Sequence, residues 1–422
     1  MGQVRDPRFP RSERRVTDSE ESTQGPLEGV RMIEFGQLLA GPYCASLMAD
    51  FGAEVIKVEA PPAGDPMRVW GREKVNDHTL WWPTLARSKK VVTLNLREPR
   101  GQELALELMA KADVALENFS PGTMEKWNIG PDEAMARNPR LIYARVSGYG
   151  QTGRYKDRVG FAAAGEAMGG LRYFNGYPGQ APPRAGISLG DTLAAKQAFE
   201  GILMALYWRD ARGSGTGQVI DAAIVDACFA MTESTITEYG LTGVIREPSG
   251  SYLSKIAPSN VHQSKDGKWV VIAANHDSLW KRLSALMGRP ELAEDERYAT
   301  HRARGEHEHE LYAMIDEWAA QYTAAELDAM LAEANVVSAG VYSAADMYDD
   351  PHFRERGLIV DIEDPEIGTM PVPGITPKLS QTPGSIRWGG KWEIGADNEE
   401  IWCGLVGLSQ SELGDLQQAG IV

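Results

Sequence analysis

The feature that most constrains this chain is a regular alternation of short apolar runs with helix-like segments. The run GVRMIEFG at residues 29–36 is followed by the helix-like PYCASLMADFGA and by a second apolar run, EVIKVEAP, at residues 54–61. A strand, a helix and a strand in this order form a β-α-β unit. The alternation continues through KKVVTLNL, RGQELALELMAKA, DVALENFSP and PRLIYARVSGYG. It predicts an α/β fold with a doubly wound, Rossmann-like parallel sheet.

The segments that follow the predicted strands are the first candidates for a binding site. Ligands of doubly wound sheets bind beyond the carboxyl ends of the strands, where loops converge and helix amino termini point. Basic residues gather on or near these segments, although the formal net charge of the 422-residue chain is −16. Such a local group of cations would suit a phosphate-bearing ligand. The segments are residues 36–42, 59–61, 94–97, 118–121 and 147–150, and the basic residues are Lys57, Arg68, Lys89, Lys90, Arg97, Lys126, Arg154 and Arg158.

Beyond residue 218 the alternation gives way to other patterns. The run VIDAAIVDACFAMTESTITEYGL at residues 219–241 predicts one long helix, and GKWVVIAA later predicts a strand that begins a new unit. The first residues are rich in Arg, Ser and Pro but also contain acids, which favours a flexible extension over a transit peptide. We therefore expect a flexible extension at 1–26, a large domain at 27–230, a linker at 231–257, a small α+β domain at 258–342 and a return segment at 343–422 that completes the large domain.

Charge and cysteine placement exclude several classes of function. The net charge of −16 opposes binding to nucleic acid or to an anionic membrane surface. Cys44, Cys228 and Cys403 fit neither a disulfide framework nor a zinc motif, and no apolar run is long enough to span a membrane. His307 and His309 would point about 200° from each other on a helix, so they would not easily share a metal ion. We expect a cytoplasmic protein with no metal.

Asp191 stands before the helix-like segment TLAAKQAFEGILMAL, and its position has two interpretations. As an N-cap, an aspartate accepts hydrogen bonds from the free N–H groups that begin a helix. The same position can hold a reacting carboxylate, because the helix dipole favours the ionised form and Gly190 leaves room for a bulky ligand. The local sequence leaves both interpretations open.

A nicotinamide-dependent oxidoreductase is one alternative for a chain of this pattern. Glu59 closes the second predicted strand, where enzymes of that class bind the ribose hydroxyls. However, the turn GQLLAGP after the first strand lacks the G-x-G-x-x-G fingerprint, and Pro42 lies where the helix should open. The motif therefore gives this alternative little support.

Several ordered motifs make the chain resemble the class III (CaiB/BaiF-type) coenzyme A transferases, the family of the formyl-CoA and carnitine CoA transferases. They are MIEFGQLLAGPYCASLMADFGAEVIKVEAP with GDPMR, VTLNLREPRGQELALELMAKADVALENFSPGTMEKWNIG, NPRLIYARVSGYGQTGRYKDR, GEAMGGL, ISLGDTLA and GTGQVIDAAIVDA. The resemblance runs from about Leu27 to the C-terminus. It implies a large Rossmann-like domain, a smaller domain and an interlocked dimer, either a homodimer or a heteromer with a homologous subunit.

The resemblance also implies a reaction and a set of site residues. CoA passes from an acyl-CoA donor to a carboxylic acid acceptor, and Asp191 of the GD motif is the nucleophile that forms an aspartyl mixed anhydride and an aspartyl-CoA thioester. No cofactor is needed besides the CoA thioester that serves as substrate. The family's CoA contacts fall at Leu39, Ala40, Leu94, Asn95, Leu96, Arg97, Asn118, Phe119, Ser120, Lys126, Arg158, Val159, Gly160 and Phe161.

The expected acyl group follows from Glu166 in GEAMGG, which resembles the subgroup that uses succinyl-CoA and dicarboxylic or related acids. Arg172 and Arg184 are expected to bind a distal carboxylate through their planar guanidinium groups, and Gln37 completes the expected substrate contacts. Backbone N–H groups at Gly190, or in the short PSGSY loop, are the expected donors to the oxyanion.

Departures from related enzymes narrow the reaction further. Leu39, Ala60 and Lys126 stand where formyl-CoA transferase has a glutamine and two arginines, and PSGSY is a reduced counterpart of that enzyme's glycine-rich loop, so formate is disfavoured as the acyl group. An acyl-CoA racemase or epimerase of the same fold is the other alternative. That reaction needs a histidine near Phe161, where this chain has none, so it is disfavoured as well.

Overall fold

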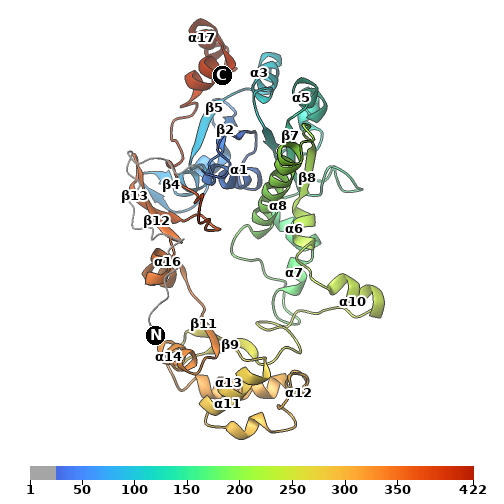
Figure 1. The fold of residues 1–422 in the computed structure, drawn as a ribbon, viewed down its shortest axis with the longest axis vertical. Helices are drawn as coiled ribbons and strands as arrows, with labels where there is room; N and C mark the ends of the chain where they lie inside the picture. Colours follow the sequence, from blue (N-terminus) through green and yellow to red (C-terminus); the bar gives the residue numbers. More distant parts are fainter. Residues whose placement is uncertain (1–24) are drawn as a thin grey trace. The chain divides into compact units, whose positions relative to one another are not determined.

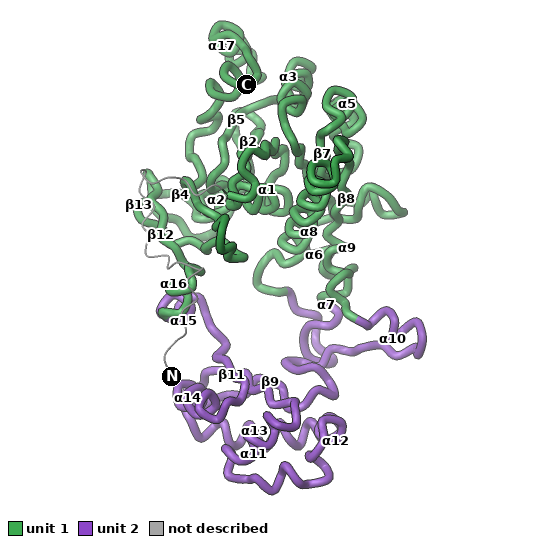
Figure 2. The backbone as a smooth tube through the Cα atoms, viewed as in Figure 1, with its two compact units in different colours: residues 1–171, 185–233, 351–422 green, residues 172–184, 234–350 purple. Residues whose placement is uncertain are grey.

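The computed structural model describes residues 25–422, so nearly all of the predicted extension at 1–26 lies outside the described residues. The described chain divides into two compact units (Figure 2). Within the described residues, unit 1 comprises residues 25–171, 185–233 and 351–422. Unit 2 comprises residues 172–184 and 234–350. The sequence analysis placed residues 172–184 in the large domain, whereas they belong to unit 2. It also placed a linker where helix α10 (Thr235–Thr242) forms.

Unit 1 is built on a six-stranded parallel sheet, so the predicted parallel α/β sheet is confirmed (Figure 1). Its strand order is β5-β2-β1-β6-β7-β8, and the direction of winding reverses between β1 and β6. Doubly wound sheets bind ligands at such a switch point. The strands are β1 (Arg31–Glu34), β2 (Glu54–Glu59), β5 (Lys89–Thr93), β6 (Val114–Glu117), β7 (Ile142–Ser147) and β8 (Val219–Ala223).

The prediction of one long helix over residues 219–241 is wrong. Val219–Ala223 form the edge strand β8, and helices α9 (Ile224–Phe229) and α10 follow it. A short apolar run such as Val219–Ala223 fits a strand as well as a helix, and its pairing with a neighbouring strand decides between the two. β8 lies parallel to β7, with Ile220 opposite Ala144. Gly217 lets the chain enter the sheet, because a Cβ there would collide with the carbonyl oxygen of Leu141.

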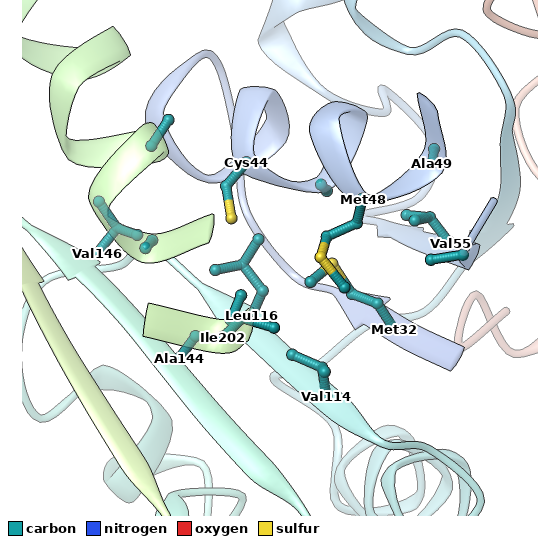
Figure 3. Close-up of a cluster of buried hydrophobic side chains, with 14 of the residues drawn as sticks. Met32, Cys44, Met48, Ala49, Val55, Val114, Leu116, Ala144, Val146 and Ile202 are labelled. Carbon is teal, nitrogen blue, oxygen red and sulfur yellow. The ribbon is translucent and has the colours of Figure 1, made fainter. Parts of the chain in front are cut away.

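Helices cover both faces of the sheet, and alternate residues of each strand face opposite cores. Helices α1 (Ala40–Asp50) and α8 (Leu189–Leu206) pack on the face that carries Met32 and Leu116, which Figure 3 shows together with Met48 and Ile202. Helices α3 (Pro99–Met109) and α17 (Gln410–Gln418) contribute to the core on the other face. The long helix α8 therefore lies beside α1 on this face of the sheet, where it contacts β7 and β8.

Unit 2 is an α+β structure with a core of its own. Its antiparallel sheet has the order β11-β10-β9 and consists of β9 (Ser259–Gln263), β10 (Trp269–Ala273) and β11 (Val337–Gly340). Helices α11 (Asp277–Leu286), α13 (Glu308–Ala319) and α14 (Ala324–Glu333) pack on it through residues such as Trp280 and Ile315.

Shorter elements complete the described chain. They are β3 (Lys74–Val75), β4 (His78–Thr79), β12 (Ile359–Asp364), β13 (Gly368–Pro373), α2 (Trp81–Leu85), α4 (Thr123–Lys126), α5 (Pro131–Arg137), α6 (Ala162–Met168), α7 (Leu171–Phe174), α12 (His301–Glu306), α15 (Ala344–Asp349), α16 (Pro351–Glu355), η1 (Pro66–Val69), η2 (Tyr207–Ala211), η3 (Pro290–Ala293) and η4 (Glu399–Val406). Among residues 25–422 there is no helix whose length and hydrophobicity would let it span a bilayer.

Candidate functional site

Residues 36–42, which comprise the end of the loop after β1 and the first turn of α1, lie at the switch point of the sheet. We call this segment the β1–α1 loop, and Asn118 ties it to the loop after β6. The side-chain Oδ1 of Asn118 accepts the N–H of Gln37 at 2.7 Å, and its Nδ2 donates to the carbonyl oxygen of Gln37 at 2.9 Å. A Cβ at Gly36 would lie 3.2 Å from this Oδ1, so a glycine suits the close approach of the two loops. The side chain of Asn118 thus holds together two segments that the sequence nominated separately.

Two buried lysines hold the ends of the same loop. Lys57 Nζ donates to the carbonyl oxygen of Gly36 at 2.9 Å, and Lys89 Nζ donates to that of Pro42 at 2.7 Å. The carboxylate of Glu34 lies between the two lysines, 2.9 Å from Lys57 Nζ and 2.8 Å from Lys89 Nζ. All three side chains are at most 1% exposed. Buried charges are tolerated where each is paired and hydrogen-bonded, as here. We call this group the Glu34 clamp.

Asp65 of the GDPMR motif supports the middle of the loop. Its Oδ2 lies 2.7 Å from Lys57 Nζ, and its Oδ1 accepts the N–H of Leu38 at 3.1 Å. Leu38 has a φ of 62°, a left-handed conformation that a leucine rarely adopts. Burial lowers the pKa of Lys57, but the carboxylates of Glu34 and Asp65 outweigh it and hold the pKa above its ordinary value. Lys57 is therefore a permanent cation beneath the loop.

Four of the eight basic residues that were expected to suit a phosphate have structural partners instead, which corrects that expectation. Lys57 and Lys89 belong to the Glu34 clamp. Arg68 lies 2.7 Å from the Glu59 carboxylate, with its guanidinium 3.7 Å from the centre of a Trp82 ring. Glu59 is thus engaged at the position where a nicotinamide enzyme would bind ribose. Lys90 pairs with Glu54 and Glu400.

The other basic residues nominated by the sequence remain available for a ligand. Arg97, Lys126, Arg154 and Arg158 are exposed, and within residues 25–422 no carboxylate forms an ion pair with any of them. The guanidinium of Arg158 lies 4.1 Å from the ring centre of Tyr155. These four side chains are therefore free to contact an anionic group.

The segments after β5, β6 and β7 carry most of the remaining residues expected to contact CoA. The N–H of Asn95 donates to the carbonyl oxygen of Ile421 at 2.7 Å, which joins the loop after β5 to the C-terminus. Gly148 follows β7 and lies so close to Gly160 that a Cβ on it would be 2.6 Å from the Gly160 Cα. This contact places Arg158, Val159, Gly160 and Phe161 beside the end of β7. The structure therefore brings the predicted segments to one edge of the sheet.

The predicted contact residues differ in what they can offer at that edge. Four of them have buried side chains and can therefore offer a ligand only their backbone. They are Leu39, Ala40, Leu94 and Leu96. Ser120 is exposed and Gln37 half-buried, while Val159 and Phe161 are 77% and 66% exposed. The half-buried ring of Phe119 contacts Trp127 edge to face at 5.3 Å between centroids.

Glu117, the last residue of β6, adjoins the candidate site but was not predicted from the sequence. Its Oε2 accepts the N–H of Phe119 at 2.7 Å, and its Oε1 accepts from Arg145 Nε at 2.8 Å. Burial raises the pKa of Glu117 to about 7, although Arg145 acts in the opposite direction. The sequence did contain a signal for the buried position of Glu117, because it is a charged residue inside an apolar strand. The same signal was present for Glu34, Lys57 and Lys89.

Asp191 lies in the first turn of α8, and the structure corrects its interpretation as the N-cap. The N-cap is Ser188, whose side chain makes no capping hydrogen bond. Asp191 is half-buried at the third helical position. The preceding Gly190 packs against Ile224, the first residue after β8, because a Cβ on Gly190 would lie 2.9 Å from Ile224 Cγ2. The amino end of α8 therefore lies at the carboxyl edge of the sheet.

Glu166 and Cys228 lie near the same turn. Glu166 is 2% exposed, and its Oε1 accepts the N–H of Gly190 at 3.1 Å. That N–H was expected to serve an oxyanion, and its engagement by Glu166 corrects this expectation. Burial, followed by the carboxylates of Glu166 and Asp191, raises the pKa of Cys228 to about 11. Cys228 therefore stays a neutral thiol near pH 7 and does not compete as a nucleophile.

The other residues expected at the substrate belong to unit 2. Arg172 is half-buried and Arg184 is exposed, and both precede the return of the chain to unit 1. In the PSGSY loop, Gly250 donates its N–H to the carbonyl oxygen of Gly176 at 2.8 Å. Unit 1 by itself therefore assembles the segments expected to bind CoA together with Asp191 and Glu166. Over residues 25–422, the structure contains no group of three or more His, Cys, Asp and Glu side chains arranged to hold a metal ion.

Comparisons with known proteins match nearly the whole chain. The profile of CoA-transferase family III matches residues 27–398. The chain is 49% identical to a succinyl-CoA–D-citramalate CoA-transferase of Chloroflexus aurantiacus, with 94% of this chain and 98% of that protein covered. It is 41% identical to the alpha subunit of a succinyl-CoA–L-malate CoA-transferase of the same species, with 98% and 96% covered. A crystal structure of a CAIB/BAIF family protein from Brucella suis is similar with a TM-score of 0.80 at 31% identity, and covers 90% of this chain and 100% of that one.

The Glu34 clamp predicts that replacing Lys89 lowers the stability of the fold much more than replacing the adjacent Lys90. Lys89→Met should lower the free energy of unfolding by about 3–5 kcal/mol, because it removes one partner of a buried carboxylate. Lys90→Met is the matched control, since Lys90 is 21% exposed in its ion pairs and its loss should cost under about 1 kcal/mol. Urea unfolding followed by circular dichroism measures both variants. Equal losses would contradict the clamp.

Proposed function

Because the chain belongs to CoA-transferase family III, as its motifs indicate, we propose that it transfers CoA from succinyl-CoA, or another dicarboxylyl-CoA, to a carboxylic acid acceptor with Asp191 as the nucleophile. The observation that carries the proposal is the place of Asp191 in the first turn of α8, at the carboxyl ends of the strands, where the loops after β1, β5, β6 and β7 also emerge. A carboxylate at a helix amino terminus is favoured in its ionised, nucleophilic form.

The proposed first half of the reaction moves CoA onto the enzyme. An oxygen of the Asp191 carboxylate attacks the thioester carbonyl of the donor, the new C–O bond forms and the C–S bond breaks. The products are a mixed anhydride and CoA thiolate. The thiolate then attacks the Asp191 carbonyl of the anhydride, which releases the donor acid as a carboxylate and leaves an aspartyl-CoA thioester. Both steps keep the free energy of the thioester in a covalent bond.

The second half repeats these steps in reverse with the acceptor. Its carboxylate attacks the aspartyl-CoA carbonyl, and CoA thiolate leaves and then attacks the acceptor's carbonyl in the new anhydride. The acceptor departs as its CoA thioester, and Asp191 returns as a carboxylate. None of the steps changes an oxidation state, and no net proton is consumed. The chemistry therefore requires neither a metal nor a redox cofactor. We expect turnover to be unchanged by EDTA.

The proposed substrates are dicarboxylic acids. The two relatives named above are succinyl-CoA-dependent enzymes whose second substrates are D-citramalate and L-malate. Arg172 and Arg184 are the residues we propose for a distal carboxylate, because a planar guanidinium can bind one through two hydrogen bonds. Cys44, Cys228 and Cys403 are free, which fits the reducing cytoplasm that we propose as the compartment.

Replacing the proposed nucleophile should abolish transfer while the fold persists. Asp191→Asn cannot form the anhydride, so transfer should fall by a factor of about 10³ or more, whereas the lost charge near the helix terminus costs only about 0.3–1 kcal/mol. Succinyl-CoA incubated with a panel of dicarboxylic acids, with acyl-CoA products identified by mass, gives the readout. Glu200→Gln, on the exposed side of the same helix, is the control and should transfer normally. Near-normal transfer by Asp191→Asn would refute this mechanism.

Affinity for CoA should depend on the exposed cations of unit 1. Replacing Arg97, Lys126 or Arg158 by Ala should each weaken CoA binding by about 1.5–3 kcal/mol if the residue makes a charge-assisted hydrogen bond to a phosphate. Lys111→Ala is a suitable control, because exposed Lys111 precedes β6 and so lies toward the opposite edge of the sheet. Calorimetry at low salt measures the affinity, and a variant with an unchanged dissociation constant removes its residue from the site.

We also propose that the working enzyme is an interlocked dimer, a homodimer or a heteromer with a homologous subunit. The L-malate relative carries the name of an alpha subunit. Large apolar side chains stand exposed in unit 1 on α8, η2, β8 and the end of α9, and exposed apolar surface of this kind is typical of an interface. They are Met204, Tyr207, Trp208, Val219, Phe229 and Met231.

Sedimentation of the active enzyme tests the dimer directly. The purified chain alone should sediment with twice the 46.2 kDa mass if it is a homodimer. If it needs a homologous subunit, transfer activity should appear only when that subunit is added and should sediment with the complex. A monomer that retains full transfer activity would contradict both forms of the proposal.

A further inference from the structure

The amino end of α8 lacks a cap from its own sequence. The first N–H groups of an α-helix have no partner within the helix and need acceptors from elsewhere. The side chain of Ser188, the N-cap residue, accepts no such hydrogen bond. Glu166, which belongs to helix α6, accepts the N–H of Gly190 at 3.1 Å instead. A carboxylate from another helix therefore holds the turn in which Asp191 lies.

The carboxylate of Glu166 is held in place by close packing of α6 against α9. A Cβ on Gly165 would lie 2.5 Å from Ile224 Cγ2, and a Cβ on Gly169 would lie 2.5 Å from Cys228 Cβ. Glycines on both sides of Glu166 thus let the two helices approach closely. Gly190 completes the contact, since a Cβ there would lie 3.1 Å from Glu166 Cγ.

We propose that Glu166 is a positioning residue, whose carboxylate fixes the first turn of α8 and with it the direction of the Asp191 side chain. This inference rests on the proposed function, in which Asp191 attacks the thioester. Attack requires the reacting atoms to be aligned at close range, and a displacement of about 1 Å costs about 100-fold in rate. Glu166 was expected to bind substrate, but a side chain in a residue only 2% exposed presents almost no surface to one.

Two variants of Glu166 distinguish the position of its hydrogen-bonding oxygen from its charge. Glu166→Gln retains an oxygen that accepts from Gly190 but lacks the charge. Glu166→Asp retains the charge but is one methylene shorter, which withdraws the carboxylate from Gly190. We expect kcat to fall about 100-fold in Glu166→Asp and in Glu166→Ala, and about 10-fold or less in Glu166→Gln. The KM values for acyl-CoA and acid should change less than about twofold, because Glu166 does not contact either substrate.

Hydrogen exchange tests the cap without any reference to activity. The amide of Gly190, followed in a peptide that spans residues 187–193, should exchange at least about 10-fold faster in Glu166→Asp than in the unmodified protein, and Glu166→Gln should retain most of the protection. Glu200→Asp on the same helix is the control and should change neither exchange nor kcat. If Glu166→Ala does not fold, the Asp and Gln variants decide the question.

Two results would overturn the inference. One is a rise in KM at constant kcat, which is the signature of a substrate contact. The other is unchanged Gly190 exchange in Glu166→Asp, which would show that the hydrogen bond does not hold the turn. Failure of the proposed function is distinct from both, because it would be seen as retained transfer in Asp191→Asn while the exchange result stands unaffected.

Discussion

The buried ion group of Glu34, Lys57 and Lys89 is the interaction on which the candidate site depends. One carboxylate holds two ammonium groups, and each ammonium also donates to a carbonyl at one end of the β1–α1 loop. The loop thereby keeps a conformation that includes a left-handed Leu38. Its fixed shape at the switch point lets the neighbouring loop after β6 dock through Asn118. Charges buried in a sheet thus shape an edge that can bind a ligand.

At the amino end of α8, on the other side of the switch point, a buried carboxylate likewise holds the backbone by a hydrogen bond. There Glu166 accepts the N–H of Gly190, and the half-buried Asp191 follows directly in the helix. In the function proposed above the two regions have different roles, since exposed cations and loop backbone suit the nucleotide of CoA and the helix terminus suits a reacting carboxylate. Cys228 near the same turn stays a neutral thiol, because burial and the carboxylates of Glu166 and Asp191 raise its pKa to about 11.

The sequence predicted the parallel sheet and the ends of most of its strands, because alternating hydrophobic patterns carry those features locally. It placed Asp191 before a helix, whereas the residue lies inside the first turn of α8. It could not show that Lys57 and Lys89 face inward, since a lysine in a strand is exposed or buried according to partners that lie far away in the chain. The strand β8 was mistaken for helix for a similar reason, because pairing with β7 decides its conformation. The cap from Glu166 to Gly190 likewise joins helices that only the fold brings together.

The most direct test of the central claim follows oxygen atoms through the reaction. When the acceptor acid carries oxygen-18 in its carboxylate, the bridging oxygen of the second anhydride stays on the enzyme after CoA thiolate attacks the acceptor's carbonyl. Turnover with succinyl-CoA and the labelled acid, followed by proteolysis and mass spectrometry, should therefore place oxygen-18 in the side-chain carboxylate of Asp191. Label in Glu166, or an unlabelled Asp191 after many turnovers, would contradict the account.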